Sequence, residues 1–400
     1  MQRVWHQVQS LRTGGQDVWV VTEGQGQWSH EDETMESDGD TVVRCNVYPS
    51  RLLRYVARAL SKVMGTAIYP DTHWQWIYGA FRRASDVIKQ QSIDTLIVSF
   101  GHPSALIASS MLKRRFKDLT LVIDVRDLWV GNPNAFASVR KKGPLAAMDR
   151  RIERRAFLLA DAVTAVSDGL IEDLQERYPF LGKKPMRVIH NGFEDALFPA
   201  EDSAKPRRQF FVFRHVGFFG PNNRLDELFT AIARARQRDD RGLTDVKFEF
   251  IGGNSALATQ LADQHGISDV TQAISYVDHG RAVELMCTAD VLLLLWGPGK
   301  GTIGGKTYEY LRSNRFILAL DQGNRDGRAL LNETGRGKWV GATDTDALTE
   351  NLLQLIGRLR AGEPLLPSPL PDIQHYSRDH QNLKLCQLVA ELANDPKIEV

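Results

Sequence analysis

The sequence predicts an α/β protein made of two doubly wound domains of similar size. From Trp74 to Gly192, short apolar runs typical of buried parallel strands alternate with segments of helical periodicity. The alternation stops in a polar stretch with two prolines, residues 199–209, and starts afresh at Phe210. Four hundred residues are enough for two substantial cores. Each domain is therefore expected to hold a parallel sheet with helices on both faces.

The first predicted domain covers residues 1–198. Its strands are recognised by runs of β-branched and apolar residues, and its helices by apolar residues at helical spacing. An acidic loop, 30–40, interrupts the first part of the domain. The expected strands are 17–23, 41–48, 95–100, 119–127, 162–167 and 186–192, and the expected helices are 51–63, 74–91, one after 101–104, 145–159 and one starting at 168.

The second predicted domain covers residues 210–372, after the linker 199–209. A proline-rich break, Pro364–Pro371, separates it from the C-terminal segment 373–400, whose helix 376–392 is expected to return to the first domain. The clearest strands are 210–218, 247–252, 291–296 and 316–321, and the helices are 225–237, 255–265, 280–288, 305–313, 326–334 and 345–360.

Composition points to a cytoplasmic protein. Hydrophobic residues make up 42% and charged residues 25% of the chain, which is ordinary for a globular protein. No apolar run approaches the ~20 residues that a membrane span needs, and the N-terminus has no apolar signal core. The 3 cysteines are widely spaced and suit neither a disulfide framework nor a zinc site.

Charge is unevenly distributed along the chain. Residues 41–190 hold 24 Lys and Arg against 13 Asp and Glu, a balance of +11, whereas the whole chain carries +1. Basic residues alternate with apolar ones in 51–63, and four arginines cluster at 150–155. Both segments are candidates for peripheral contact with an anionic membrane, at its inner face. The alternative is that they are helices packed on the domain with solvated basic faces.

The stretch Gly301–Leu311 has the features of a nucleotide site. It follows the apolar run 289–296 and a Gly/Pro turn, so a strand, a loop and a helix are expected in that order. Gly304 and Gly305 leave the first amides of the helix free to face an anion. Lys306 adds a positive charge, and one turn further Glu309 offers a carboxylate to a vicinal diol. The alternative is a Gly-rich loop that caps an ordinary helix.

Ligands of doubly wound sheets bind at the carboxyl ends of the strands. Two such domains are expected to face each other across a cleft, and polar residues follow several of the predicted strands. They are His102, Arg126, Asp127, His190 and Asn191 in the first domain, and Arg224, Lys306 and Glu309 in the second.

Five motifs, in order over nearly the whole chain, resemble the GT-B glycosyltransferases and among them the retaining family 4. Val122–Trp129 is similar to the family's Asp-x-Arg-Asp-x-Trp strand end, and Lys306–Tyr310 to its Lys-x-x-Glu-Tyr helix. The other three motifs are Ala160–Ser167, Val188–Phe193 and Asp326–Gly335. The resemblance implies the GT-B fold, with the acceptor bound by the first domain and a nucleotide diphosphate sugar by the second.

The resemblance also implies roles for individual residues. Glu309 binds the ribose, Arg224 and Lys306 bind the diphosphate, and Arg126, Asp127 and His102 lie near the reacting carbon. No metal or other cofactor is expected, because Arg, Lys and helix amides neutralise the leaving diphosphate. The remaining donor-binding residues that the resemblance implies are Thr302, Gly304, Gly305, Thr307, Gly220 and Gly252.

Two departures from the family pattern stand out. The usual Gly-Arg-x-x-x-x-Lys-Gly is replaced by Gly217–Arg224, with Phe218 at the Arg position and Asn223 at the Lys position, so Arg224 is the expected substitute. Relatives also begin with a strand and a Gly-rich loop that this sequence lacks. A start codon assigned late is the favoured explanation, and a reduced first domain is the alternative.

The leading functional hypothesis is a retaining hexosyltransferase (EC 2.4) that moves a sugar from a nucleotide diphosphate sugar to an acceptor hydroxyl. The acceptor is expected to be a glycan or a lipid-linked glycan in surface polysaccharide or glycolipid synthesis, and no nucleic acid is expected as a partner. Two alternatives stay open. One is a sugar-nucleotide 2-epimerase, and the other is a catalytically inactive binding protein with the same fold.

Overall fold

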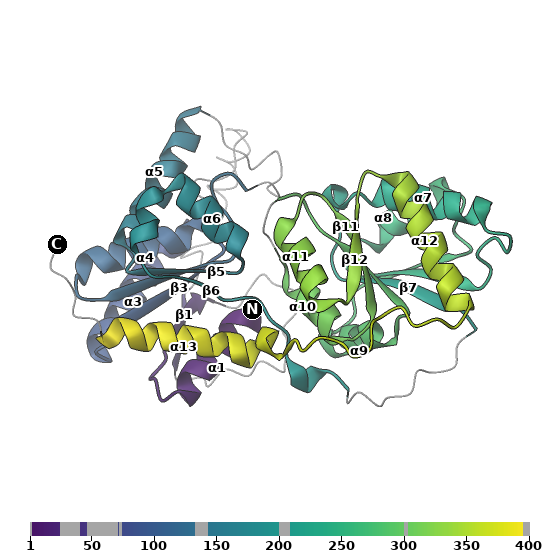
Figure 1. Ribbon diagram of the computed structural model, residues 1–400. Helices are drawn as coiled ribbons and strands as arrows, with labels where there is room; N and C mark the ends of the chain where they lie inside the picture. Colours follow the sequence, from purple (N-terminus) through teal and green to yellow (C-terminus); the bar gives the residue numbers. More distant parts are fainter. Residues whose placement is uncertain are drawn as a thin grey trace. The chain divides into compact units, whose positions relative to one another are not determined.

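A computed structural model describes residues 2–24, 41–45, 71, 74–132, 143–199, 209–299 and 303–394. The chain divides into two compact units (Figure 1). The first unit comprises Met1–His190 and Asn382–Val400, and the second comprises Asn191–Gln381. The predicted helix 51–63 and the predicted acidic loop 30–40 lie outside the described residues.

The first unit is built on a parallel sheet. Its strands β3 (Thr95–Phe100), β4 (Thr120–Val125), β5 (Ala162–Ala165) and β6 (Met186–Val188) pair in this order. All six residues of β4 are buried, which fits a central strand covered on both faces. Strands β1 (Val20–Glu23) and β2 (Val42–Cys45) form a separate parallel pair.

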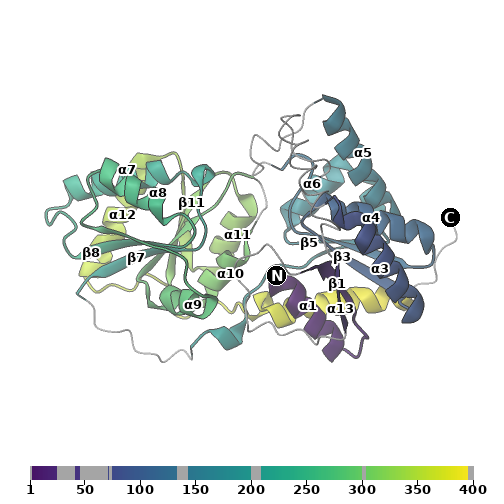
Figure 2. The same ribbon diagram turned by 180° about the vertical axis from the view of Figure 1, so that it is seen from behind.

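Helices cover both faces of the first unit's sheet. In the views of Figures 1 and 2, α1 and α13 lie on one side of the sheet, and α4, α5 and α6 lie on the other. Leu388 of α13 packs on Val122 and Ala162, so the C-terminal helix returns to the first unit as predicted. The helices of this unit are α1 (Gln2–Thr13), α3 (Trp76–Gln90), α4 (Pro103–Arg115), α5 (Gly143–Leu159), α6 (Asp168–Arg177) and, across the boundary between the units, α13 (Arg378–Asn394).

A buried ion pair joins α1 to the sheet. Arg3 Nη2 lies 2.8 Å from Asp124 Oδ1, and Arg3 Nε lies 3.1 Å from Asp124 Oδ2. Thr164 and Gln7 donate further hydrogen bonds to the same carboxylate. Burial raises the pKa of Asp124, but the Arg3 charge and these hydrogen bonds outweigh it, so the net pKa is lowered. Asp124 therefore has the structural role that its position inside a strand suggests.

The second unit is a doubly wound sheet of six parallel strands in the order β12-β11-β10-β7-β8-β9. The order reverses between β10 and β7, and in such sheets ligands bind at this switch point. The strands are β7 (Phe211–Val216), β8 (Val246–Ile251), β9 (Thr271–Ile274), β10 (Val291–Leu295), β11 (Phe316–Asp321) and β12 (Gly337–Gly341).

Two apolar cores sandwich this sheet. Phe229, Phe248 and Leu352 belong to the core under α7, α8 and α12. Leu292 and Tyr308 belong to the core under α9, α10 and α11. The helices are α7 (Leu225–Arg238), α8 (Ser255–Gln264), α9 (His279–Thr288), α10 (Gly305–Arg312), α11 (Arg325–Thr334) and α12 (Thr345–Arg360).

The observed fold is the predicted α/β class, but its units divide at other residues than the sequence suggested. Residues 191–198 pack with the second unit, because Phe193 and Phe198 are buried in the core under α9, α10 and α11. Ile373 and Tyr376 join the same core, so the chain leaves the second unit at Gln381 instead of 372. Most of the predicted linker, 200–208, lies outside the described residues.

The Arg3–Asp124 pair gives a stability prediction. Arg3→Met leaves a fully buried carboxylate without its cation, so we expect the free energy of unfolding of the first unit to fall by about 3–5 kcal/mol. Chemical denaturation measures this change. As a control, Arg187→Met removes an ion pair with Glu391 in which both side chains are about half exposed, and we expect it to cost about 1 kcal/mol or less. Equal effects of the two substitutions would contradict the structural role of Arg3.

Candidate functional site

Glycines bring two loops together where β7 and β8 end. Gly217 and Gly252 both have φ of +120°, and a Cβ on Gly252 would lie 2.7 Å from Gly217 O. The same loops support the ring of Phe218, whose Cδ2 lies 2.7 Å from where a Cβ on Gly253 would be. Phe218 is nevertheless 70% exposed. The second unit therefore presents bare backbone and an exposed aromatic ring at the carboxyl end of its sheet.

Lys306 extends from α10 over this glycine loop. Its Nζ lies 3.3 Å from His215 Nε2 and 3.5 Å from Phe218 O, and a Cβ on Gly217 would lie 2.3 Å from that nitrogen. Burial of the ammonium group lowers the pKa of Lys306 to about 8, and the charge of Glu309 partly opposes this. An anion at this place would raise the pKa of Lys306 again and favour its charged form, which is what a phosphate site requires.

His215 forms the floor under Lys306. The ring is 1% exposed, and its Nδ1 lies 2.8 Å from Leu293 O. Burial and then the charge of Lys306 hold the pKa of His215 well below its ordinary value, so the ring is neutral. With Nδ1–H donating to Leu293 O, Nε2 is left to accept from the ammonium group of Lys306.

Glu309 is nine-tenths buried one turn after Lys306. Its Oε1 lies 3.0 Å from His279 Nε2 and 3.6 Å from Arg378 Nη2. Among the described residues, nothing forms a hydrogen bond or ion pair with its Oε2. This oxygen is not among the buried side-chain atoms that lack a partner, so solvent or a ligand can reach it. Glu309 thus offers one oxygen to an incoming donor.

The other predicted donor residues lie around α10 and β7 with different exposures. Gly304 is the N-cap of α10 and is exposed, Gly305 begins the helix, and Thr307 is only 2% exposed inside the unit. The amide of Gly220 donates to Asn223 Oδ1 at 2.8 Å in a tight turn. Thr302 lies outside the described residues.

Arg224 lies just after this turn, with φ of +53°, at the start of α7. Its side chain is 50% exposed and pairs with Glu227 at 3.0 Å. No contact brings it to Lys306 or Glu309 within the described part of the chain. Its role on the diphosphate stays a prediction.

In the first unit, the predicted acceptor-side residues come from the ends of two adjacent strands. His102, after β3, is the exposed N-cap of α4. Arg126 follows β4, and its amide donates to Phe100 O at 3.3 Å. Asp127 is exposed beside it, and the two side chains, both described, do not form an ion pair. Adjacent parallel strands therefore bring these three residues to one edge of the first unit's sheet.

Sequence reasoning missed three residues of the site. His215 follows Arg214 inside a buried strand, and this pair of polar residues in a mainly apolar run is the signal that could have drawn attention to it. His279 begins α9, and Arg378 begins α13. Both contact Glu309 from distant positions in the chain, and no sequence signal predicts such contacts. His190, one of the polar residues expected after the strands of the first domain, has its Nδ1 3.1 Å from Val166 O, and burial lowers its pKa.

Comparisons with known proteins agree with this architecture. Residues 2–192 match the family model of the glycosyl transferase 4-like domain. Sucrose-phosphate synthase from Thermosynechococcus elongatus has a similar structure, with a TM-score of 0.70, 15% identity, and coverage of 98% of this chain and 92% of that chain. No match is found among curated proteins.

Two further solved structures are informative. HepE from Anabaena, in complex with UDP, is similar with a TM-score of 0.57 and 14% identity, over 94% of this chain and 99% of that one. A putative UDP-N-acetylglucosamine 2-epimerase from Listeria monocytogenes is similar with a TM-score of 0.50 and 13% identity, over 81% and 82%.

The fold and the family match together indicate the class of protein to which this chain is similar. The chain has the GT-B fold, and the predicted resemblance to the GT-B glycosyltransferases is confirmed. The family model of the glycosyl transferase 4-like domain matches residues 2–192 of this fold.

None of the described helices is both long enough and apolar enough to span a bilayer. Within the same part of the chain, no cluster of three or more His, Cys, Asp or Glu side chains could hold a metal ion.

The environment of Lys306 gives a titration prediction. Its amine becomes the neutral nucleophile as the pH rises through about 8, whereas an ordinary lysine does so near 10.4. Brief acetylation at pH 7–10, read by peptide mass spectrometry, should therefore show half-maximal reactivity of Lys306 near pH 8. In His215→Phe, which keeps an aromatic ring but removes the acceptor, the midpoint should shift. A midpoint near that of exposed lysines would contradict the described burial.

Proposed function

We propose that the protein transfers a hexose from a nucleoside diphosphate sugar to an acceptor hydroxyl, with retention of anomeric configuration. The observation that carries this proposal is the pairing of Lys306 and Glu309 on one short helix. The ammonium of Lys306 lies over a glycine loop, and one turn away Glu309 has a carboxylate oxygen without a partner among the described residues. A cation for phosphates and a carboxylate for a ribose hydroxyl suit a nucleoside diphosphate.

In this mechanism, the bond between the anomeric carbon and the β-phosphate oxygen breaks while the acceptor oxygen bonds to the same face of that carbon. The acceptor's hydroxyl proton passes to the departing phosphate oxygen. Lys306, with Arg224 and the first amides of α10, stabilises the negative charge that develops on the diphosphate. Because these side chains are positively charged and these amides are polar donors, the proposed mechanism does not include a metal ion.

The acceptor belongs to the first unit in this proposal. His102, Arg126 and Asp127 lie at one edge of its sheet, where an acceptor hydroxyl can be hydrogen-bonded. We propose a glycan or lipid-linked glycan as the acceptor, in surface polysaccharide or glycolipid synthesis. The family match of residues 2–192 supports a glycosyltransferase domain here.

A 2-epimerase is the second candidate, because a putative enzyme of this kind is among the structural neighbours. An epimerase needs no acceptor, whereas a transferase does. Incubation with UDP-sugars alone, followed by separation of the sugar nucleotides, distinguishes the two. Appearance of a C2-epimeric sugar nucleotide without acceptor would favour the epimerase, and nucleotide binding without any turnover would favour an inactive binding protein.

Glu309→Gln tests the nucleotide site. A neutral amide accepts a weaker hydrogen bond than a carboxylate, so we expect the Kd for nucleoside diphosphates to rise about 10- to 100-fold. Calorimetry with UDP, GDP and ADP measures this effect, and circular dichroism checks that the fold is kept. Glu333→Gln, at an exposed carboxylate of α11 in the same unit, is the control and should bind as the unchanged protein does. Unchanged nucleotide affinity in Glu309→Gln would remove the main support for the proposal.

We also propose that helix α5 contacts an anionic membrane surface at the inner face of the membrane. Its exposed side chains include four arginines and three apolar residues. Burial and then the nearby charge of Arg155 lower the pKa of Arg114 on α4, so basic groups of two helices are close together. Arginines beside exposed apolar side chains are typical of surfaces that bind anionic lipid. These residues are Leu145, Met148, Arg150, Arg151, Arg154, Arg155 and Leu158.

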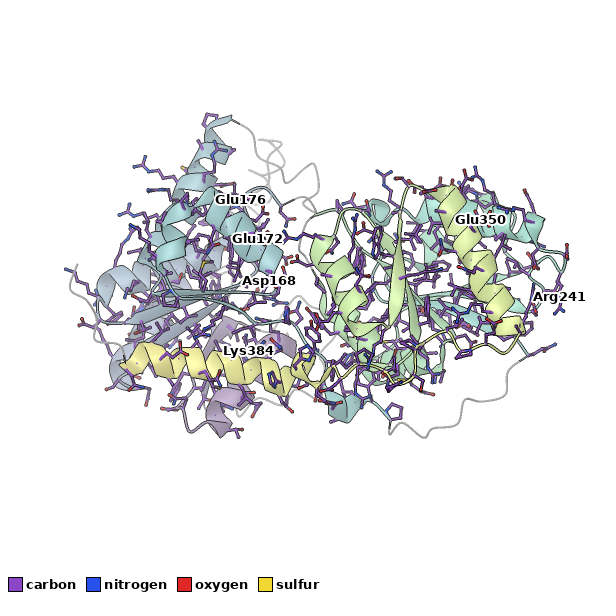
Figure 3. The ribbon with its side chains drawn as sticks, in the orientation of Figure 1. Asp168, Glu172, Glu176, Arg241, Glu350 and Lys384 are labelled. Carbon is purple, nitrogen blue, oxygen red and sulfur yellow. The ribbon has the colours of Figure 1, made fainter. Side chains whose placement is uncertain are left out.

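The neighbouring helix α6 has the opposite charge. Figure 3 shows Asp168, Glu172 and Glu176 along it. An anionic surface is therefore attracted to α5 and repelled by α6, which gives the first unit a preferred orientation on such a surface.

The membrane proposal is tested by the double variant Arg151→Glu, Arg155→Glu. Each basic residue near an anionic surface contributes about 1 kcal/mol, so reversing two charges should weaken sedimentation with phosphatidylglycerol vesicles more than tenfold. Binding to phosphatidylcholine vesicles should be weak in all proteins. The matched control, Arg238→Glu with Arg241→Glu, reverses two exposed charges of the second unit. Equal loss in both double variants would contradict a membrane surface on α5.

A further inference from the structure

We infer that His279 is a positioning residue that holds one oxygen of Glu309. The other oxygen alone then accepts a hydrogen bond from the ribose, and it recognises one of the two ribose hydroxyls. The inference rests on the proposed function, because it concerns the ribose of the proposed nucleotide. It changes the expectation that the carboxylate accepts from both hydroxyls of the vicinal diol.

The two contacts of Glu309 fall on the same atom. His279 Nε2 lies 3.0 Å from Oε1, and Arg378 Nη2 lies 3.6 Å from Oε1. A carboxylate oxygen has two lone pairs for hydrogen bonds. Oε1 therefore accepts a hydrogen bond from His279 and lies in a longer ion pair with Arg378, whereas Oε2 has neither kind of contact among the described residues.

The hydrogen-bond direction between His279 and Glu309 is fixed by chemistry. An ionised carboxylate can only accept, so His279 Nε2 carries the hydrogen and donates it. Asp278 caps α9 by accepting from the amide of Arg281 at 2.8 Å, and this holds His279 in the first turn of the helix. The donor thus comes from a helix end whose position is defined independently of Glu309.

Arg378 is held from another direction. Its amide donates to Phe193 O at 2.7 Å, and its Nη1 lies 3.4 Å from Glu194 Oε2. The side chain is 7% exposed, compared with 27% for His279. A ligand that approaches Glu309 can therefore reach His279 more easily than Arg378, and His279 is the informative residue to change.

Recognition of a diol by both carboxylate oxygens would require a hydroxyl to reach Oε1 beside His279 and Arg378. While these two side chains lie against Oε1, Oε2 is the oxygen without a contact among the described residues, and it can orient toward one hydroxyl. Loss of a hydrogen bond to a charged group weakens binding by about 10- to 100-fold. Removal of the recognised hydroxyl should have this effect, and removal of the other should change affinity less than threefold.

The experiment compares deoxy analogues of the nucleotide. The tightest binder among UDP, GDP and ADP is identified by calorimetry, and its 2′-deoxy and 3′-deoxy forms are then measured. In the unchanged protein we expect the two Kd values to differ about tenfold or more. In His279→Ala, the carboxylate is free to turn and accept from both hydroxyls, so the ratio should fall toward one. His279→Gln, whose amide can still donate, should restore part of the ratio.

The ratio separates positioning from a merely structural role. If His279 only supported the fold, His279→Ala would weaken all three ligands equally and leave the ratio unchanged. His265→Ala is the matched control, because His265 also pairs with a carboxylate in the second unit, 3.0 Å from Asp226. We expect it to keep both the affinities and the ratio.

Two results would overturn the inference while leaving the proposed function intact. One is equal Kd values for the two deoxy forms in the unchanged protein, and the other is a ratio that His279→Ala does not alter. If the unchanged protein binds none of the three nucleotides, or if Glu309→Gln binds them normally, the proposed function fails and the inference fails with it.

Discussion

The position of α10 on the sheet of the second unit is the constraint on which the candidate site depends. The hydroxyl of Tyr310 accepts from the amide of Val216 at 2.7 Å and lies 3.3 Å from Val216 O. This contact fixes α10 against the last residue of β7, directly before the glycine loop. Tyr310 is fully buried, so no solvent competes for it. As a result, Lys306 extends over Gly217, and Glu309 meets His279.

The same helix supports the segments through which the chain enters and leaves the second unit. Asn191 Nδ2 donates to Ile303 O at 2.9 Å, just before α10, and Arg312 on α10 pairs with Asp195 at 2.5 Å. The entering and leaving segments are themselves joined, since the amide of Phe193 donates to the carbonyl of Tyr376 at 3.2 Å. The helix proposed to bind the nucleotide is therefore also the support for both ends of its unit.

The sequence predicted most of the fold because the strands of both units are strongly apolar and their helices strongly periodic. It missed the strands β9 and β12. In β12, Gly337 and Lys338 weaken the apolar pattern, and tertiary pairing with β11 decides the structure. It placed the end of the first unit too late, because Phe193 and Phe198 give no sign of which core they enter. In the site, Lys306 and Glu309 were found from one local motif. His279 and Arg378 were not, because their contacts with Glu309 depend on how α9 and α13 pack.

The arrangement of Glu309 argues for a ligand more strongly than for a structural ion pair. A structural pair is most stable when both carboxylate oxygens are satisfied, as in Asp124, where Arg3 and Thr164 contact Oδ1 and Arg3 and Gln7 contact Oδ2. Glu309 is 8% exposed and Asp124 is 0% exposed, so both are buried residues. The two partners of the Glu309 carboxylate, however, both contact the same oxygen. The second oxygen is not among the buried side-chain atoms that lack a partner, so water or a ligand hydroxyl can reach it. A ligand hydroxyl that takes the place of water there would donate a charge-assisted hydrogen bond to Glu309, which can contribute to binding.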